Sequence, residues 1–378
     1  MVAAITGFSS SFAIVLAGLT AVGATPAQAA SGLLATCVAQ GMLAIVLSSV
    51  FRTPIKFAWS TPGAALLVAT AGITGRFGEA VAAFIVAALL IVLVGLLPAL
   101  GRLIARIPRS ISSAMLAGIL FPLCLAPVTA SVQIPALALP VVLVWLVLTR
   151  FAPKWAVPAS IVLAGVLLAA TVGSGWMDGA RLAPGIEFVR PELDPLVVVS
   201  IALPLFVVTM AGQNIPGAAI LVGYGFEPHA RQALVGSGVL SAVGALFGAI
   251  TINYAALTQA LTAGPEASPE VARRWVAPVS AGVTYLALGM SAGVATSFVA
   301  ASPPLLIQAV AGLALLGALV GAITAAVETA AHRLAATITF LVTASGISVI
   351  GVGSAFWGLI VGGAVLLLLT VGRRHPGG

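Results

Sequence analysis

Apolar stretches long enough to cross a lipid bilayer constrain this chain more than any other feature. Residues 78–100, for example, contain a single charged residue, Glu79. A membrane-spanning helix needs about 20 predominantly apolar residues. Only 7% of the 378 residues are charged, whereas about a quarter are charged in a soluble domain. The alternation typical of a β-barrel is absent, so the sequence predicts an all-α polytopic membrane protein.

Basic residues separate these stretches in a regular way. Thirteen of the sixteen Lys and Arg residues fall into seven groups, and neighbouring groups lie roughly 40 to 75 residues apart, which leaves room for one out-and-back pair of spans between them. The groups are Arg52 with Lys56; Arg102, Arg106 and Arg109; Arg150 with Lys154; Arg231; Arg273 with Arg274; Arg333; and Arg373 with Arg374. The positive-inside rule then places these groups and both termini in the cytoplasm. The net charge of +7 is therefore explained by basic residues in the cytoplasmic loops, and no nucleic-acid partner is expected.

Seven out-and-back pairs predict fourteen transmembrane segments. The predicted ranges are 10–28, 33–51, 57–73, 78–100, 110–126, 133–149, 155–173, 196–214, 231–248, 251–263, 274–297, 303–323, 333–350 and 353–371. A twelve-span alternative has to merge or lose short segments, most easily 57–73 and 251–263. An Ala-Gln-Ala at 27–29 looks like a signal-peptidase site, but the first 51 residues contain no Lys or Arg, so we expect residues 10–28 to be a retained span.

The two halves of the chain are expected to form an inverted repeat. The one long polar loop, about 173–195, lies at mid-chain. We therefore assign spans 1–7 to residues 1–175, a periplasmic linker to 176–195, and spans 8–14 to 196–378. Shifting the sequence by 194 residues superposes Phe12 on Phe206 and Ala117-Gly118 on Ala311-Gly312. Seven is an odd number, so the second half enters the membrane from the opposite face, as in many secondary transporters.

Spans 3 and 10 are expected to be broken. In span 3, Phe57-Ala58-Trp59 favours an extended strand, and Ser60, Thr61 and Pro62 are typical of a helix start. In span 10, Thr251 to Tyr254 favours a strand, and AALTQALTA at 255–263 favours a helix. The N-termini of two opposed half-helices present unpaired N–H groups that favour an anion. Because no Lys or Arg is expected within a span, such ends would bind a carboxylate without a full positive charge.

Two adjacent amides, Gln213 and Asn214, end the predicted span 8. An unsatisfied amide in hydrocarbon costs several kcal/mol, so the pair is expected beside a cavity or a polar partner. Pro216 and Gly217 follow directly and are expected to loosen the helix there. An alternative is that both amides lie at a membrane face or pair with a neighbouring helix.

Three motifs carry a resemblance to a known family. AWSTPGAALL (58–67), VTMAGQNIPG (208–217) and FLVTASGISVIGVGSAFWGLIVGG (340–363) resemble the benzoate/proton symporter (BenE-type) family over nearly the whole chain. The family is similar in predicted architecture to the uracil/xanthine permeases. The resemblance implies a seven-plus-seven inverted repeat. It also implies a core domain of spans 1–4 and 8–11 that moves against a gate domain of spans 5–7 and 12–14.

The resemblance further implies proton-coupled uptake of benzoate or a similar aromatic carboxylate across the bacterial inner membrane. In the permeases, acidic side chains of spans 8 and 10 bind the base; the matching positions here look like Gln213 and roughly Asn253-Tyr254, which are neutral. The expected substrate-binding residues are Ser60, Thr61, Gln213, Asn214, Asn253, Tyr254 and Thr258, with Phe12 as a candidate for stacking on the ring.

Other function classes are less well supported by the sequence. Cys37 and Cys124 lie far apart, and the three histidines are scattered in or near loops, so no metal site and no cofactor are expected. Nearly all acids lie in predicted loops, which disfavours an enzyme. The alternatives are a nucleobase or inorganic-anion permease of the same fold, or a passive channel. The expected partners are the substrate, protons and lipid, with a homodimer as the candidate assembly.

Overall fold

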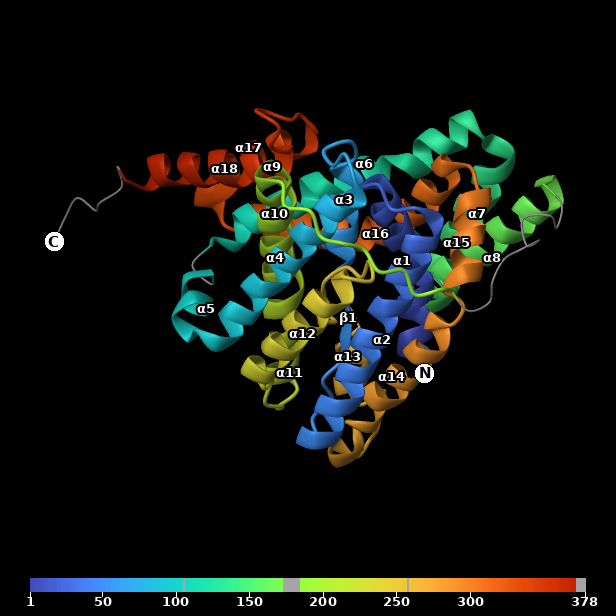
Figure 1. Cartoon of the computed structure of the whole chain (residues 1–378), viewed down its shortest axis with the longest axis horizontal. Helices are drawn as coiled ribbons and strands as arrows, with labels where there is room; N and C mark the ends of the chain where they lie inside the picture. Colours follow the sequence, from blue (N-terminus) through green and yellow to red (C-terminus); the bar gives the residue numbers. More distant parts are fainter. Residues whose placement is uncertain (105–106, 173–183, 257, 372–378) are drawn as a thin grey trace.

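The chain is almost entirely helical, as the computed structural model in Figure 1 shows. The structure describes residues 1–104, 107–172, 184–256 and 258–371. The helices of the first half are α1 (Val2–Ala21), α2 (Pro26–Phe51), α3 (Thr61–Ala69), α4 (Phe77–Leu96), α5 (Pro98–Ile104), α6 (Arg109–Gln133), α7 (Pro135–Phe151) and α8 (Pro153–Val172). Those of the second half are α9 (Pro195–Val197), α10 (Leu203–Thr209), α11 (Ile215–Gly223), α12 (Ala230–Ala245), α13 (Ala260–Ala263), α14 (Val276–Gly289), α15 (Ala292–Ala301), α16 (Pro304–Val327), α17 (Arg333–Ala344) and α18 (Ser354–Val371).

Within the described residues, six helical segments are long and apolar enough to cross a membrane, and a seventh is formed by a bent pair. The bent pair joins 271–289 to α15 with a change of direction of 58°. The six segments are Pro26–Phe51, Phe77–Leu96, Arg109–Gln133, Pro153–Thr171, Pro195–Gly223 and Pro304–Val327. Shorter apolar helices at Ser11–Ala21, Pro135–Phe151, Ala330–Ala344 and Ser354–Leu369 complete the set. The chain is therefore a mostly helical, multi-pass membrane protein.

The first two helices meet earlier than predicted. The predicted span 10–28 contains the turn between α1 and α2, where Gly23 has a φ of 95°. The helix α2 begins directly after Thr25, whose side chain accepts a hydrogen bond from the Gln28 N–H, while the Gln28 side chain accepts one from the Thr25 N–H. This reciprocal capping box, followed by Pro26 in the first turn, fixes a helix start inside the predicted span.

The helix that carries Gln213 and Asn214 does not end at Asn214, contrary to the prediction. It continues from Pro195 to Gly223 and contains two π-helical turns, Val198–Ala202 and Met210–Asn214. Each π turn is followed two residues later by a proline, Pro204 or Pro216. A proline cannot donate the usual i→i−4 hydrogen bond and its ring crowds that carbonyl, so a widened turn accommodates it without ending the helix.

Two short strands pair with each other, and Figure 1 labels the first of them, β1, near the middle of the molecule. The strand β1 (Phe57–Trp59) pairs antiparallel with β2 (Ile252–Tyr254), with Ala58 opposite Asn253. Backbone bonds extend the ladder at both ends, from Ser60 N–H to the Thr251 carbonyl (2.9 Å) and from Ala255 N–H to the Lys56 carbonyl (3.0 Å). Both predicted strands are therefore present.

The helices after the two strands differ. The nine-residue α3 begins two residues after β1, as predicted, whereas α13 spans only Ala260–Ala263 instead of the predicted 255–263. Pro62 and the Ser60 side chain start α3, but no side-chain cap starts α13. A four-residue helix has no appreciable aligned dipole, so the expected pair of opposed half-helix N-termini is reduced to one.

The long helices pack in characteristic pairs. The most extensive contacts join α6 to α16, α2 to α14, and α4 to α12. A second set of contacts joins α17 to α6 and α18, and α7 to α8. Figure 1 shows α17 and α18 at one edge of the molecule and α7 and α8 at the opposite end. Gly358 and Gly362 allow α18 to approach Thr343 and Thr339 of α17, which agrees with the GxxxG spacing in the last helix.

The polar loop expected as a linker is partly described. Residues 173–183 lie outside the described residues, and 184–194 run extended across the front of the molecule in Figure 1. Val189 N–H donates to the Leu246 carbonyl (2.7 Å), and Glu192 N–H donates to the Gly78 carbonyl (2.9 Å). The Arg76 guanidinium lies 3.0 Å from the Glu192 carboxylate. These bonds hold the segment against the ends of α4 and α12.

Candidate functional site

A small polar cavity lies beside the crossing of the two strands. Its volume is about 60 Å³, well below the roughly 300–1,000 Å³ of typical small-molecule sites. Residues from α1, β1, α3, the Met210–Asn214 turn, the segment after β2, α14 and α16 surround it: Gly7, Ser11, Ala58, Trp59, Thr61, Gln213, Ala255, Thr258, Tyr285, Ala314 and Leu315. Thr61, Gln213 and Thr258 were predicted. None of these described lining residues carries a carboxylate.

The start of α3 forms one wall. The Ser60 side chain accepts a hydrogen bond from the Gly63 N–H (3.1 Å) and lies 2.9 Å from the Thr209 hydroxyl oxygen. Ser60 is completely buried and supports the helix end, while Thr61, the first residue of α3, faces the cavity. Thr61 therefore presents a hydroxyl beside the positive end of a nine-residue helix, where an anion is favoured.

The segment after β2 forms a second wall from side chains. Thr258 lines the cavity, and the adjacent Gln259 is completely buried behind it. The Gln259 side chain accepts from the Lys56 N–H (3.1 Å) and donates to the Pro54 carbonyl (2.6 Å). It therefore joins the polypeptide before β1 to the polypeptide after β2. Sequence analysis missed Gln259 because the QAL stretch was interpreted as the middle of a helix.

The two amides of the helix Pro195–Gly223 have different surroundings. Gln213 lines the cavity. Asn214 does not; its Oδ1 accepts from the Tyr254 N–H (3.1 Å) and its Nδ2 donates to Met210 Sδ (3.3 Å). Asn214 therefore attaches β2 to this helix, so its partner is a strand and not the neighbouring helix of the alternative. The geometry is compatible with substrate contact for Gln213 only.

Asn253 and Tyr254 also belong to the framework around the cavity. Asn253 is fully buried, and in the amide orientation that satisfies both neighbours it donates to the Tyr254 carbonyl (2.7 Å) and accepts from the Ser60 N–H (3.1 Å). The Tyr254 hydroxyl donates to the Pro228 carbonyl, and its ring stacks on Phe57 at a centroid distance of 5.5 Å. Neither residue is among those that line the cavity.

Aromatic rings border the cavity on the α1 side. The Trp59 indole N–H donates to the Ser11 hydroxyl (2.9 Å), and Trp59 makes edge contacts with Phe8 and Tyr285. Phe12, the predicted stacking residue, packs against Phe8 (5.3 Å between centroids) and Phe298 (6.5 Å) and is not a lining residue. Trp59 and Tyr285 are the rings that a bound aromatic substrate would meet.

Lys56 is the residue that sequence analysis placed least well. It was grouped with Arg52 in a cytoplasmic loop. Arg52 is exposed, with its guanidinium 4.2 Å from the Trp275 ring centroid, but Lys56 has no exposed surface. Its Nζ donates to the Thr258 hydroxyl and lies 5.8 Å from the Tyr285 ring centroid. The structure therefore places a buried lysine next to the candidate site, in a region where no Lys or Arg was expected.

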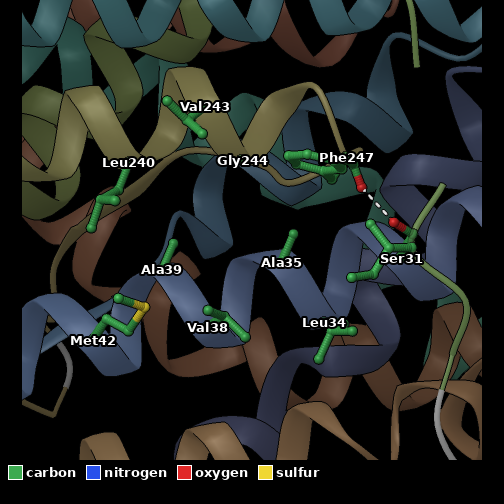
Figure 2. Close-up of a pocket in the computed structure, with 11 residues that line it drawn as sticks. Ser31, Leu34, Ala35, Val38, Ala39, Met42, Leu240, Val243, Gly244 and Phe247 are labelled. Atoms are coloured by element: carbon green, nitrogen blue, oxygen red, sulfur yellow. Dashed lines mark hydrogen bonds between the residues drawn. The ribbon is translucent and has the colours of Figure 1, made fainter. Parts of the chain in front are cut away.

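A larger cavity lies elsewhere and has a different character. Figure 2 shows it between α2 and the end of α12, with Leu34, Val38 and Met42 on one side and Leu240 and Val243 on the other. Its volume is about 260 Å³. The Ser31 hydroxyl donates to the Phe247 carbonyl (3.0 Å), so the polar group at its end is already satisfied. This apolar groove offers nothing for a carboxylate, and the smaller cavity is the better candidate site.

The small cavity combines three chemical features. Hydroxyls and an amide offer hydrogen bonds, a helix N-terminus favours negative charge, the amino group of Lys56 lies nearby, and aromatic rings offer apolar contact. A planar ring bearing one carboxylate matches this combination. Of the lining residues, Ala314 and Leu315 belong to α16, and the others belong to the segments from α1 to α3 and from the Met210–Asn214 turn to α14.

Comparison with known proteins gives consistent matches over nearly the full chain. The family model described as "Benzoate membrane transport protein" matches residues 1–368. The "Inner membrane protein YdcO" of Escherichia coli (strain K12) is 38% identical over 98% of this chain and 94% of its own length. The "Benzoate membrane transport protein" of Acinetobacter baylyi (strain ATCC 33305 / BD413 / ADP1) is 36% identical over 84% of this chain and 80% of its own length.

Two solved structures share the fold at low sequence identity. The transmembrane domain of the cyanobacterial bicarbonate transporter BicA aligns with a TM-score of 0.56 at 17% identity, covering 98% of this chain and 96% of that chain. The structure of SLC26A9 aligns with a TM-score of 0.58 at 14% identity, covering 99% of this chain and 66% of that chain. These alignments concern the fold alone.

Proposed function

The chain belongs to the benzoate membrane transport protein family, and we propose that it is a secondary active transporter that takes up benzoate or a similar aromatic carboxylate together with protons. Family membership places it among membrane transporters. The choice of substrate and the coupling to protons are the parts proposed here. By analogy with the Escherichia coli relative, we propose that it lies in the inner membrane. The positive-inside rule supports the proposal that both termini are in the cytoplasm.

The observation that carries the proposal is the cavity beside the strand crossing. Thr61, Gln213 and Thr258 provide neutral polar groups, and Trp59 and Tyr285 provide ring surfaces. A carboxylate in place of the Gln213 amide would repel an anionic substrate, whereas a neutral amide and a helix N-terminus attract it. These features favour an aromatic acid over a nucleobase.

The packing pattern supports a seven-plus-seven inverted repeat with fourteen spans. In the proposed numbering, α2 and α14 are spans 2 and 11, and α4 and α12 are spans 4 and 9. In a seven-plus-seven repeat, a two-fold rotation exchanges each span of the first half with the span seven places later. The rotation therefore places the pair of spans 2 and 11 on the pair of spans 9 and 4. The pair of α6 and α16 (spans 5 and 12) and the pair of β1 and β2 are each placed on themselves, with their two members exchanged. All four pairs are in contact, as an inverted repeat requires.

The same contacts support a division into a core domain, spans 1–4 and 8–11, and a gate domain, spans 5–7 and 12–14. The cavity lies where core residues face Ala314 and Leu315 of α16 in the gate domain. Relative movement of the domains would widen this small space and open it to one side of the membrane at a time. Alternating access of this kind is the proposed mechanism.

Uptake of radiolabelled benzoate into proteoliposomes tests the proposal. An imposed pH gradient, alkaline inside, is expected to drive saturable accumulation that a protonophore abolishes. Benzoic acid also crosses lipid unaided, so uptake by protein-free liposomes has to be subtracted. Gln213→Ala is expected to lower the protein-dependent rate about tenfold or more because it removes a substrate hydrogen bond. The exposed Gln232→Ala serves as the matched control.

Each alternative predicts a different result. Protein-dependent uptake that ignores the pH gradient contradicts proton coupling, and non-saturable flux that an uncoupler leaves unchanged indicates a channel. Competition by uracil, but not by unlabelled benzoate, indicates a nucleobase permease. Full activity of Gln213→Ala would show that the substrate binds elsewhere.

A further inference from the structure

We propose that Lys56 is the residue that pairs with the substrate carboxylate and carries the coupled proton. This inference rests on the proposed function and deepens it, because neither the family match nor the relatives name a proton-carrying group. Lys56 has no exposed surface and lies immediately behind the wall of the candidate site.

The amino group of Lys56 is enclosed by residues that line the cavity. Its Nζ donates to the Thr258 hydroxyl and lies 5.8 Å from the Tyr285 ring centroid. A methyl group built on Gly7, a third lining residue, would lie 3.8 Å from the same Nζ. The amino group of Lys56 is therefore adjacent to three of the residues that line the cavity.

The backbone fixes Lys56 in this place. Its N–H donates to Gln259 Oε1 (3.1 Å), and its carbonyl accepts from Ala255 N–H (3.0 Å). Lys56 therefore continues the β1 ladder at the strand crossing, where it cannot withdraw to water without breaking the pairing. A lysine used only for topology would not need such a fixed position.

The titratable groups that face the amine from the described neighbouring elements are few. They are the Tyr285 hydroxyl of α14, with the Cys37 thiol of α2 behind it, and the amino group of Met1 at the start of α1. Thr258 and Gln259, from the segment after β2, do not titrate. A substrate carboxylate held in the cavity would complement a positive charge on Lys56.

The proposed step balances charge and protons. The neutral amine of Lys56 binds one proton from the side where the site is open, and the resulting ammonium pairs with one carboxylate. Burial of an ammonium is costly, and a bound carboxylate offsets that cost, so proton and substrate each favour binding of the other. The pair crosses as a net neutral unit. On the other side the carboxylate leaves, and the ammonium then releases its proton to water.

Three variants of the full chain separate charge, proton transfer and structure. Lys56→Met keeps an apolar chain of similar length without charge. Lys56→Arg keeps the positive charge, but a guanidinium does not release its proton in proteins. The control Lys154→Met removes an exposed lysine that pairs only with Glu266 on the surface, at 3.2 Å. Benzoate binding to the purified proteins by calorimetry, and proton uptake on binding in weakly buffered, mildly alkaline solution, are the two readouts.

The wild type and Lys154→Met are expected to bind benzoate and take up a proton as they do so. Lys56→Met is expected to bind about tenfold or more weakly, because a charge-assisted hydrogen bond is lost. Lys56→Arg is expected to bind benzoate without taking up a proton, and to exchange benzoate across liposomes without concentrating it in a pH gradient.

The possible failures differ. Wild-type affinity in Lys56→Met overturns the carboxylate pairing, and undiminished proton uptake in Lys56→Arg overturns the proton-carrying role; in both cases the proposed function stands. A wild-type protein that does not bind benzoate overturns the proposed function itself, and the assignment of Lys56 falls with it.

Discussion

The two strand-containing units that cross at the centre of the protein are built differently. After β1, a side-chain cap and a proline start a nine-residue helix at once. After β2, five residues precede a helix of only four residues, and side chains take the place of the helix end. Thus the first unit contributes the start of α3 and Lys56, which directly precedes β1, and the second contributes Thr258, whose hydroxyl accepts a hydrogen bond from Lys56 Nζ.

In the proposed inverted repeat, the two units therefore need not give a symmetric site. The strands of the two units pair with each other, but the residues that follow the strands form different structures. Because an anionic substrate needs positive potential on one side only, one helix N-terminus and one lysine are sufficient. We therefore expect mutations in the two units to have different effects.

The largest effect is expected where one side chain joins both units. Gln259→Leu leaves the buried Lys56 N–H and Pro54 carbonyl without their partner. The loss is expected to cost about 2–6 kcal/mol of stability, since each of the two unsatisfied buried groups costs ~1–3 kcal/mol. The loss of stability is measured by thermal unfolding in detergent, in which the disappearance of the monodisperse species is the signal. Gln232→Leu on the exposed face of α12 is the control, and an equal melting temperature for both variants would mean that the units are not joined through Gln259.

A smaller loss of stability is expected from substituting the two glycines at which a helix packs closely against each unit. A methyl group on Gly18 of α1 would lie 2.7 Å from the Ala64 carbonyl oxygen of α3, and one on Gly217 of α11 would lie 2.5 Å from Tyr254 Cβ. Gly→Ala at either position is expected to destabilise the protein by about 1–3 kcal/mol through overpacking. The same melting assay applies, with Gly363→Ala, which has open space around it, as the control. Tolerance at Gly217 alone would show that the second unit is the more adaptable one.

The smallest effect is expected at the helix cap itself. Ser60→Ala removes the acceptor for the Gly63 N–H and the contact with Thr209, at a cost of ~0.5–2 kcal/mol. Benzoate affinity should also fall about threefold, because the first turn of α3 is less fixed. Ser237→Ala is the matched control, since that buried hydroxyl only donates to Leu234 of its own helix. Unchanged affinity in Ser60→Ala would remove α3 from the binding site.

The architecture was easier to predict from sequence than the site. The spacing of basic residues located most helices, and Ser60, Thr61 and Pro62 located the start of α3, because these signals are local. The helix through Gln213 and Asn214 was predicted to end too early, since a π turn that accommodates Pro216 leaves no local signature in the sequence. The start of α2 was missed although the Thr25–Gln28 capping box is readable.

Burial was the property that sequence could not supply. Ser60, Asn214, Asn253 and Tyr254 are polar residues in an apolar chain, and their type alone does not show whether they face a cavity or bond to another segment. Here they bond to other segments. Conversely, Lys56 follows Arg52 by four residues, and nothing in that spacing shows that one is exposed and the other enclosed.

The antiparallel pairing of β1 with β2 also bears on how the protein is made. Ala58 pairs with Asn253, and a ribosome adding about 5–20 residues per second needs roughly 10 to 40 s to synthesise the chain between them. During that time the polar backbone of residues 57–60 has no strand to bond with, and exposing it to lipid tails would be costly. The newly made N-terminal half must therefore keep this segment sheltered, in the insertion machinery or at the headgroup level, until the C-terminal half emerges and completes the ladder.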